Sequence, residues 1–248
     1  NYIIKYCFGQ NIRTYSVPKI SDILLRSSVE LNLFDSPLLL SRNNQGLQIE
    51  QEIMKRIIDI VGSLIGIVIT IPIFLIVGIC IKMTDGGPVI YQQTRLTKNG
   101  KKFQIYKFRT MVQNAEADGK ARLASEGDPR ILPIGRVLRA TRLDELPQIY
   151  NILKGDMSIV GPRPERPELA AELEKEIPEF SFRLQVKAGL TGYAQVYGKY
   201  NTTPYDKLKL DLTYIRNYSV LEDLKLIIMT PKIMLMKEST EGVKEEQK

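Results

Sequence analysis

An uninterrupted stretch of 22 residues without a charge, Ile60–Ile81, limits what this chain can fold into more than any other feature. As a helix it would be about 33 Å long, which matches the hydrocarbon core of a bilayer. Lys55 and Arg56 precede it and Lys82 follows it. A buried core helix is the alternative, but a soluble helix of this length usually has a polar face, and this stretch has almost none. The sequence therefore predicts a membrane helix.

Pro72 lies in the middle of this apolar stretch. A proline inside a helix removes one backbone hydrogen bond and clashes with the preceding turn, so we expect a bend there. Two geometries follow: one bent span, or a re-entrant hairpin that enters and leaves on the same face. Basic residues flank both ends of the stretch. Because such residues are enriched on cytoplasmic flanks, they favour the re-entrant hairpin.

The rest of the composition narrows the chemistry. Lys and Arg outnumber Asp and Glu by 35 to 28, and the net charge of +7 suits anionic partners, although a solvated basic face is the alternative. The chain has no histidine, which excludes His-based triads and His-ligated zinc sites. Two cysteines form no disulfide framework and fit a reducing compartment. Catalysis therefore falls to other side chains, carboxylates among them.

The expected domain boundaries are 1–50, 51–83, 84–237 and 238–248. The first segment has the pattern of the end of a small α/β unit, with a strand expected over Ile12–Val17 and a short helix over 22–26. The second contains the membrane helix. The last is a polar tail.

The segment 84–237 has a soluble character. A β-hairpin is expected over Val89–Phe108, with its turn at Lys98-Asn-Gly100, and a helix is expected near 111–125. The apolar stretch 221–236 is too short to span a membrane. It is expected to lie in the membrane interface or to pack on the protein core.

Asp144 and Glu145 are adjacent acids at a predicted helix start. Pro147 is tolerated only in the first turn of a helix, and Gly155 is a natural stop, so the sequence predicts a helix over 144–154. Both acids would then lie where the helix dipole stabilises negative charge. Acids that cap helices are common, so a structural role stays open beside a catalytic one.

Many cations accompany these acids in the sequence. They are Lys101, Lys102, Lys107, Arg109, Arg139, Arg142, Arg163 and Arg166. In Gly161-Pro-Arg-Pro164 two prolines stiffen the backbone around Arg163, and a pre-organised guanidinium suits bidentate phosphate binding. Acids among cations predict either a structural ion-pair network or a metal-bridged phosphate site.

Asp144 is the candidate nucleophile of such a site. Carboxylates attack phosphorus in some transferases and form acyl phosphates, which divides one difficult step into two easier ones. Mg²⁺ would neutralise a diphosphate and help a nucleoside monophosphate to leave. Glu145 points about 100° away on a helix, so we expect it to position or deprotonate an acceptor.

Seven segments of the chain occur in a specific order. They are Lys55–Asp59, the apolar stretch, Tyr106–Met111, Leu143–Gln148, Leu153–Met157, Val160–Pro164 and Lys187–Gln195. Together they resemble the bacterial sugar transferase family, also called the monotopic polyprenyl-phosphate phosphoglycosyl transferases. The resemblance runs from about residue 52 to 237, which is most of the chain.

The resemblance implies a membrane-associated α/β (α+β) fold. It combines a re-entrant membrane helix hairpin with a small cytoplasmic catalytic domain that carries amphipathic surface helices, at the bacterial inner membrane. Residues 1–50 would be the C-terminal remnant of the nucleotide-binding-like α/β domain of larger members, so the chain is expected to be a C-terminal part. Small members often have Ser-Pro at the membrane bend. This chain has Ile71-Pro72, and Thr70 is expected to take the serine's place.

The resemblance also implies the roles of individual residues. Asp144 matches the nucleophile and Mg²⁺ ligand, and Glu145 matches its partner in the catalytic pair. Lys107, Arg139 and Arg163 match basic residues around the substrate phosphates. The donor would be a UDP-sugar and the acceptor undecaprenyl phosphate, and the products would be UMP and a polyprenyl diphosphate sugar that initiates exopolysaccharide or capsule synthesis. The sugar and any homo-oligomer stay open.

Three other classes of function are alternatives. A non-catalytic membrane scaffold would use the ion pairs structurally. A membrane-anchored nucleic-acid binder would carry its cations along one stripe with interleaved aromatic residues, whereas here they accompany the acids, so we expect no nucleic-acid partner. A different glycosyltransferase is excluded only by the family resemblance.

Overall fold

The computed structural model describes residues 2–10, 12–15, 17–25, 29–33, 36–40, 48–113, 115, 128–199 and 201–234. The chain divides into two compact units, Asn1–Asn43 and Asn44–Lys248. Each unit is described by itself.

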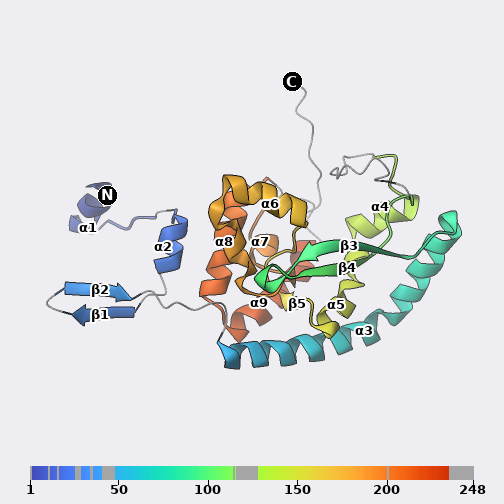
Figure 1. Ribbon diagram of the computed structural model, residues 1–248, viewed down its shortest axis with the longest axis horizontal. Coiled ribbons are helices and arrows are strands. Elements are labelled where there is room, and N and C mark those ends of the chain that lie inside the picture. Colours follow the sequence, from blue (N-terminus) through green and yellow to red (C-terminus); the bar gives the residue numbers. More distant parts are fainter. Residues whose placement is uncertain are drawn as a thin grey trace, which may run out of the picture. The chain divides into compact units, whose positions relative to one another are not determined.

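The smaller unit contains two helices and one hairpin (Figure 1). The helices are α1 (Tyr2–Gly9) and α2 (Ile20–Leu25), and the strands are β1 (Val29–Leu33) and β2 (Ser36–Leu40), which pair antiparallel. Helix α2 confirms the short helix expected here. The strand expected over Ile12–Val17 is wrong, because its described residues adopt no regular structure. The assignment of residues 1–50 to a remnant of a nucleotide-binding-like domain stays a prediction.

In the larger unit, helix α3 (Ile49–Asp85) contains the whole apolar stretch and is long and apolar enough to cross a membrane. It runs along one side of the unit and bends towards its C-terminal end (Figure 1). Pro72 lies inside it, and Thr70 Oγ1 donates a hydrogen bond to the Gly66 carbonyl at 2.7 Å. Such back-bonding and a proline both bend helices. The structure therefore has one continuous helix, and the re-entrant hairpin stays a prediction.

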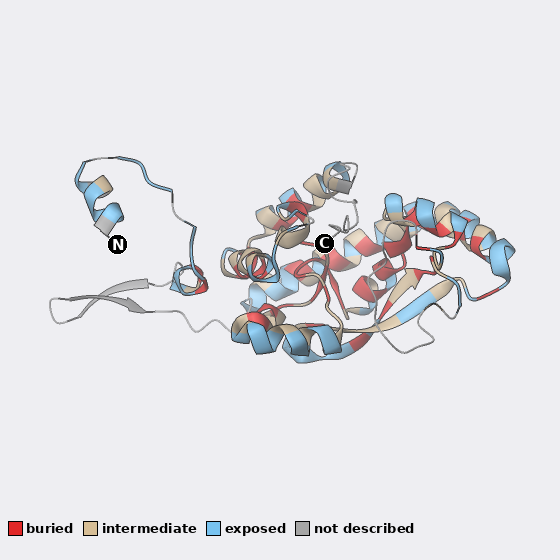
Figure 2. Cartoon of the chain, turned by 90° about the horizontal axis from the view of Figure 1, so that it is seen from above, coloured by how far each residue is buried: buried red, intermediate tan, exposed pale blue. Residues whose placement is uncertain are grey.

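Helix α3 has the opposite burial pattern to a helix of a soluble protein: apolar side chains are exposed and charged side chains are buried. Ile57, Leu64 and Val68 are exposed, whereas Lys55 and Asp59 are buried against the rest of the unit. Only 17 % of its most apolar window is buried. Exposed positions follow the outer side of the unit in Figure 2, and buried positions lie inside it. A soluble core helix would bury its apolar residues instead, so this distribution argues for a lipid-facing helix.

The same unit contacts α3 near both of its ends. Near the start, the Arg56 guanidinium donates to the carbonyl oxygens of Ile152 and Leu153, each at 2.7 Å. Near the end, Ile81 is fully buried in an apolar cluster that includes Phe108. These contacts hold the whole length of the helix against the unit.

The remaining elements of the larger unit are two pairs of strands and a set of helices. The antiparallel hairpin consists of β3 (Ile90–Leu96) and β4 (Lys102–Phe108), joined by the 3₁₀ turn η1 (Lys98–Gly100). The parallel pair consists of β5 (Ser158–Val160) and β6 (Gly189–Thr191). The helices are α4 (Pro133–Ala140), η2 (Leu143–Glu145), α5 (Gln148–Lys154), α6 (Pro167–Glu176), η3 (Pro178–Gln185), α7 (Tyr193–Val196), α8 (Pro204–Arg216) and α9 (Val220–Met234).

The hairpin expected at Val89–Phe108 is confirmed, and Asn99 takes the left-handed conformation (φ 59°) that its turn requires. The helix expected near 111–125 falls mostly outside the described residues. Met111 forms an isolated bridge with Ile131 instead of beginning a helix. Helix α9 packs on the protein core as one of the two expectations had it, because Leu226 is fully buried; Ile228 is 76 % exposed, and a place in the membrane interface stays a prediction.

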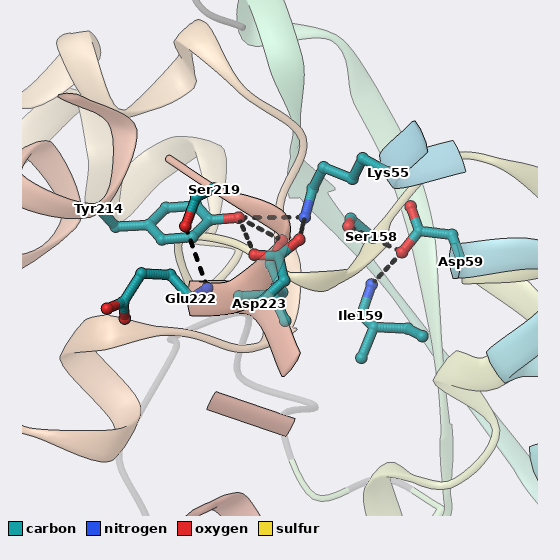
Figure 3. Close-up of polar contacts among 9 residues, drawn as sticks. Lys55, Asp59, Ser158, Ile159, Tyr214, Ser219, Glu222 and Asp223 are labelled. Carbon is teal, nitrogen blue, oxygen red and sulfur yellow. Dashed lines mark hydrogen bonds and ion pairs between the residues drawn. The ribbon is translucent and has the colours of Figure 1, made fainter. Parts of the chain in front are cut away.

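A buried polar cluster fastens the N-terminal part of α3 (Figure 3). Lys55 Nζ lies 2.6 Å from Asp223 Oδ2 and donates to Tyr214 Oη at 3.0 Å, and Tyr214 Oη donates to Asp223 Oδ1 at 2.7 Å. One turn later, Asp59 accepts a hydrogen bond from the Ile159 backbone N–H in β5 at 2.8 Å. Helix α3 is therefore joined to α8, α9 and β5 by buried charges.

We predict that Lys55→Ala lowers the free energy of unfolding by roughly 3–5 kcal/mol, because it leaves the Asp223 carboxylate buried without its cation. The double variant Lys55→Met/Asp223→Leu should lose much less. Urea unfolding in detergent measures both. The exposed pair Lys225–Glu222 supplies the control, since Lys225→Ala should cost less than about 1 kcal/mol. Equal losses for Lys55→Ala and Lys225→Ala would contradict the prediction.

Candidate active site

The two adjacent acids lie in a turn between α4 and α5. The helix predicted over 144–154 is confirmed from Gln148 to its stop at Gly155 but is wrong at its start: η2 is a 3₁₀ turn, and α5 begins at Gln148 with Pro147 as its N-cap. Arg142 has φ 59° and turns the chain out of α4. Asp144 and Glu145 are therefore positioned by a turn and by what packs around it.

Glu145 is a buried carboxylate shared by two cations. Lys107 Nζ, from β4, donates to Glu145 Oε1 at 2.7 Å, and Arg163 Nη2 donates to the same oxygen at 2.8 Å. Burial opposes ionisation of Glu145, but Arg163 and Lys107 outweigh it and hold the pKa of this carboxyl well below its usual value. Glu145 in turn raises the pKa of Arg163. At neutral pH Glu145 is ionised and holds both cations in place.

Asp144 has a different environment, although it is the next residue. It is 9 % exposed, and within the described part of the chain no hydrogen bond reaches its carboxylate. Burial raises the pKa of Asp144, while the charges of Lys107, Arg139 and Arg142 oppose that rise. A carboxylate that accepts no hydrogen bond from the described residues is available for nucleophilic attack or metal ligation.

The structure reduces the cations of the sequence cluster to a smaller set around the acids. Lys107 and Arg163 contact Glu145 directly, and Arg139 acts on Asp144 through its charge. Arg139 Nε donates to Thr110 Oγ1 at 3.1 Å, which fixes its side chain. The three predicted phosphate-binding residues are thus brought together. Their role in binding phosphate stays a prediction.

Arg109 belongs to a different contact. Its guanidinium donates to both carboxylate oxygens of Asp85, with Nη1 at 2.6 Å from Oδ2, and so ties β4 to the end of α3. Side-chain hydrogen bonding to Arg109 lowers the pKa of Asp85 to about 2. This arginine is structural.

Glycines bring the segment that carries Arg163 close to β6. The Gly161 backbone N–H donates to the Thr191 carbonyl at 2.8 Å, and the Gly189 N–H donates to the Pro162 carbonyl at 2.9 Å. A Cβ at Gly161 would lie 2.4 Å from the Lys187 carbonyl oxygen. No other residue fits there, and the Pro-Arg-Pro segment leaves β5 in a defined direction.

The sequence reasoning missed Asn151. This fully buried side chain of α5 accepts a hydrogen bond from the Tyr106 N–H at 3.0 Å and donates to the Gln104 carbonyl at 2.7 Å. It fixes β4 beside Lys107. In the sequence, Asn151 is only a polar residue within a short helix. It cannot be told from a surface residue until its partner strand β4 is known.

The predicted Mg²⁺ fits this donor set in one specific way. The described residues include no group of three or more His, Cys, Asp or Glu that would hold a metal alone. Asp144 offers one carboxylate without hydrogen-bond donors. In phosphate-transferring sites Mg²⁺ is usually bound by one or two carboxylates together with substrate phosphate oxygens and water. The site suits a Mg²⁺ that is shared with a diphosphate.

The family model of the bacterial sugar transferases matches residues 50–237, which include α3, both acids and Arg163. The chain belongs to the bacterial sugar transferase family. The resemblance of the seven segments is thereby confirmed.

Curated relatives in this family carry related names. The UDP-N-acetylgalactosamine-undecaprenyl-phosphate N-acetylgalactosaminephosphotransferase of Aeromonas hydrophila is 40 % identical over 185 residues, covering 73 % of this chain and 44 % of that protein. The undecaprenyl-phosphate galactose phosphotransferase of Salmonella typhimurium is 36 % identical over 239 residues (90 % and 49 %). The UDP-glucose:undecaprenyl-phosphate glucose-1-phosphate transferase of Klebsiella pneumoniae is 38 % identical over 203 residues (80 % and 42 %). The matched region is just under half of each relative, and their names differ in the sugar.

We predict that Asp144→Asn raises the melting temperature at about pH 8 and that this gain shrinks as the pH falls towards about 3.8, the ordinary pKa of the carboxyl. Because the folded-state pKa of Asp144 is raised above its ordinary 3.8, ionisation costs stability above that pKa and costs nothing once the carboxyl is protonated in both states. Thermal unfolding at both pH values measures the difference. Asp206→Asn is the matched control, since the pKa of Asp206 is lowered by its hydrogen bond to Lys209, and this variant should show no gain. A gain in melting temperature that does not depend on pH would contradict a raised pKa of Asp144.

Proposed function

We propose that the protein transfers a sugar 1-phosphate from a UDP-sugar to undecaprenyl phosphate, releases UMP, and initiates the synthesis of an exopolysaccharide or capsule. The observation that carries this proposal is that the two adjacent carboxylates have different surroundings. Asp144 is buried with free oxygens, and Glu145 is bound to Lys107 and Arg163. The names of the relatives support the same substrates for this chain.

In the first step, an Asp144 oxygen attacks the phosphorus that bears the sugar. A bond forms between that oxygen and phosphorus, the bond from phosphorus to the UMP oxygen breaks, and UMP leaves with the electron pair. The product is a covalent aspartyl-phosphosugar. Lys107, Arg139 and Arg163 stabilise the phosphate charge during transfer. Mg²⁺, when bound at Asp144, would supply further neutralisation of the diphosphate.

In the second step, a phosphate oxygen of undecaprenyl phosphate attacks the same phosphorus. The acyl-phosphate bond breaks, the Asp144 carboxylate is regenerated, and undecaprenyl diphosphate sugar leaves. The attacking oxygen is already anionic, so no general base is required. The lowered pKa of Glu145 makes it a weak base, which supports the positioning of cations as its role and disfavours proton abstraction.

We also propose that α3 enters and leaves the bilayer on one face, with the larger unit on the cytoplasmic side of the inner membrane. Glu52 near its start pairs with Lys98, and Asp85 at its end pairs with Arg109. Both partners belong to the same β3–β4 hairpin, so both ends of the helix contact one soluble element. A straight crossing would place these two contacts on opposite sides of the membrane.

A UMP-release assay tests the reaction. Full-length chain in detergent or nanodiscs, Mg²⁺ and undecaprenyl phosphate are presented with a panel of UDP-sugars. We expect UMP from one donor, and we expect Asp144→Asn to lower the rate about 10³-fold or more because it removes the nucleophile. Asp206→Asn should match the wild type.

Omission of the acceptor extends this test to the covalent step. With a donor labelled in the sugar, the wild type should release up to one UMP per protein and retain the label, whereas Asp144→Asn should do neither. Normal turnover by Asp144→Asn would overturn the nucleophile assignment. Silence of folded, lipid-bound wild type across the panel would favour the scaffold alternative.

Cysteine labelling tests the membrane geometry. Glu50→Cys and Thr84→Cys, in a chain whose Cys7 and Cys80 are replaced by serine, place one thiol beside each end of α3. A membrane-impermeant maleimide should label neither thiol from the periplasmic side of intact cells and both thiols after lysis. Labelling of one thiol alone in intact cells would mean a spanning helix and would contradict the re-entrant proposal.

A further inference from the structure

Arg183 is a buried arginine that none of the preceding assignments uses. It lies in η3 and is 6 % exposed. Its Nη2 donates to the backbone carbonyl of Arg163 at 2.9 Å and lies 2.8 Å from Asp211 Oδ2, a carboxylate of α8 that is 1 % exposed. Its Nη1 lies 3.6 Å from Glu165 Oε1. One buried guanidinium therefore joins α8 to the segment that carries the proposed phosphate-binding arginine.

The backbone of this segment is held at successive carbonyl groups. The acceptors and their donors are Pro162 with the Gly189 N–H at 2.9 Å, Arg163 with Arg183 at 2.9 Å, Pro164 with Arg95 Nη1 at 3.4 Å, and Glu165 with the Leu96 N–H at 3.0 Å. Two of these donors, the N–H groups of Gly189 and Leu96, belong to the main chain, so a side-chain substitution does not remove them. The carbonyl of Arg163 itself depends on a side chain, Arg183.

The support matters because the Arg163 side chain is not enclosed. It is 42 % exposed, and it reaches Glu145 Oε1 at 2.8 Å from a backbone that two prolines restrict. Its guanidinium is therefore held at Glu145 at one end and by the direction of its backbone at the other. A displacement of about 1 Å at a binding group can reduce catalysis about 100-fold. From these contacts we infer that Arg183, held by Asp211, positions Arg163 for the phosphates of the donor. The inference rests on the proposed function.

An arginine suits this task better than a lysine. Its planar group carries five N–H donors in a rigid fork, so it donates to the Arg163 carbonyl while its charge lies beside the Asp211 carboxylate. The guanidinium also lies 5.0 Å from the centre of the Phe180 ring, which restricts its rotation. A lysine at this position would keep the charge beside Asp211 and lose the geometry.

A double-variant cycle tests the inference. Arg183→Lys should raise the KM for the UDP-sugar about tenfold and change kcat less, because the proposed contact of Arg163 is with donor phosphate and is present before the reaction. In an Arg163→Ala background, the same Arg183→Lys change should have no further effect on KM. This non-additivity is expected only if Arg183 acts through Arg163.

A second variant distinguishes a loss of Arg163 positioning from a loss of folding stability. Arg183→Met/Asp211→Asn removes both buried charges, so neither is left unpaired, and its melting temperature should stay near that of the wild type. Its KM for the donor should still be raised. Asp206→Asn makes the same acid-to-amide change on the exposed side of α8 and should leave KM unchanged.

The outcomes distinguish this inference from the proposed function. Additive effects in the cycle, or a wild-type KM in the folded Arg183→Met/Asp211→Asn variant, would overturn the positioning role while the wild type still releases UMP. Failure of the wild type to release UMP with any donor would overturn the proposed function, and the inference with it.

Discussion

The ionised Glu145 carboxylate, shared by Lys107 and Arg163, is the interaction on which the site depends. Its three members come from β4, η2 and the segment after β5. A buried carboxylate is tolerated only when cations offset the loss of hydration, so this contact requires the three segments to meet. Glu145 takes the contacts of Lys107 and Arg163, and among the described residues no hydrogen bond to the adjacent, buried Asp144 carboxylate is found. One electrostatic requirement thus organises the packing and also prepares the candidate nucleophile.

Helix α3 and the candidate site are linked through the short strand β5. Asp59 of α3 accepts a hydrogen bond from the Ile159 N–H, and four residues later the chain reaches Arg163. Lys55 joins the same part of α3 to α8 and α9 through Tyr214 and Asp223. Since these contacts are polar and buried while the opposite side of α3 is apolar and exposed, the helix keeps a defined orientation on the larger unit.

Local patterns predicted local structure well where the backbone itself was constrained. The hairpin at Val89–Phe108 followed from two strand-like runs and the turn between them at Asn99-Gly100. The helix predicted over 144–154 failed at its start, because Arg142 adopts a left-handed conformation and the acids form a 3₁₀ turn held by Lys107 and Arg163. That turn is stabilised by residues distant in the chain, which no local pattern contains.

By itself, the sequence determined the long apolar helix, the family, and the residue types that suit phosphate chemistry. The length of an apolar stretch and the order of motifs are properties of the chain alone. Only the tertiary structure decided which cations meet the acids, and it separated Arg109 from Lys107 and Arg163. It also decided that Asn151 and Arg183 are buried supports. The physical reason is that the cost of burying a polar group depends on partners that come together only when the chain has folded.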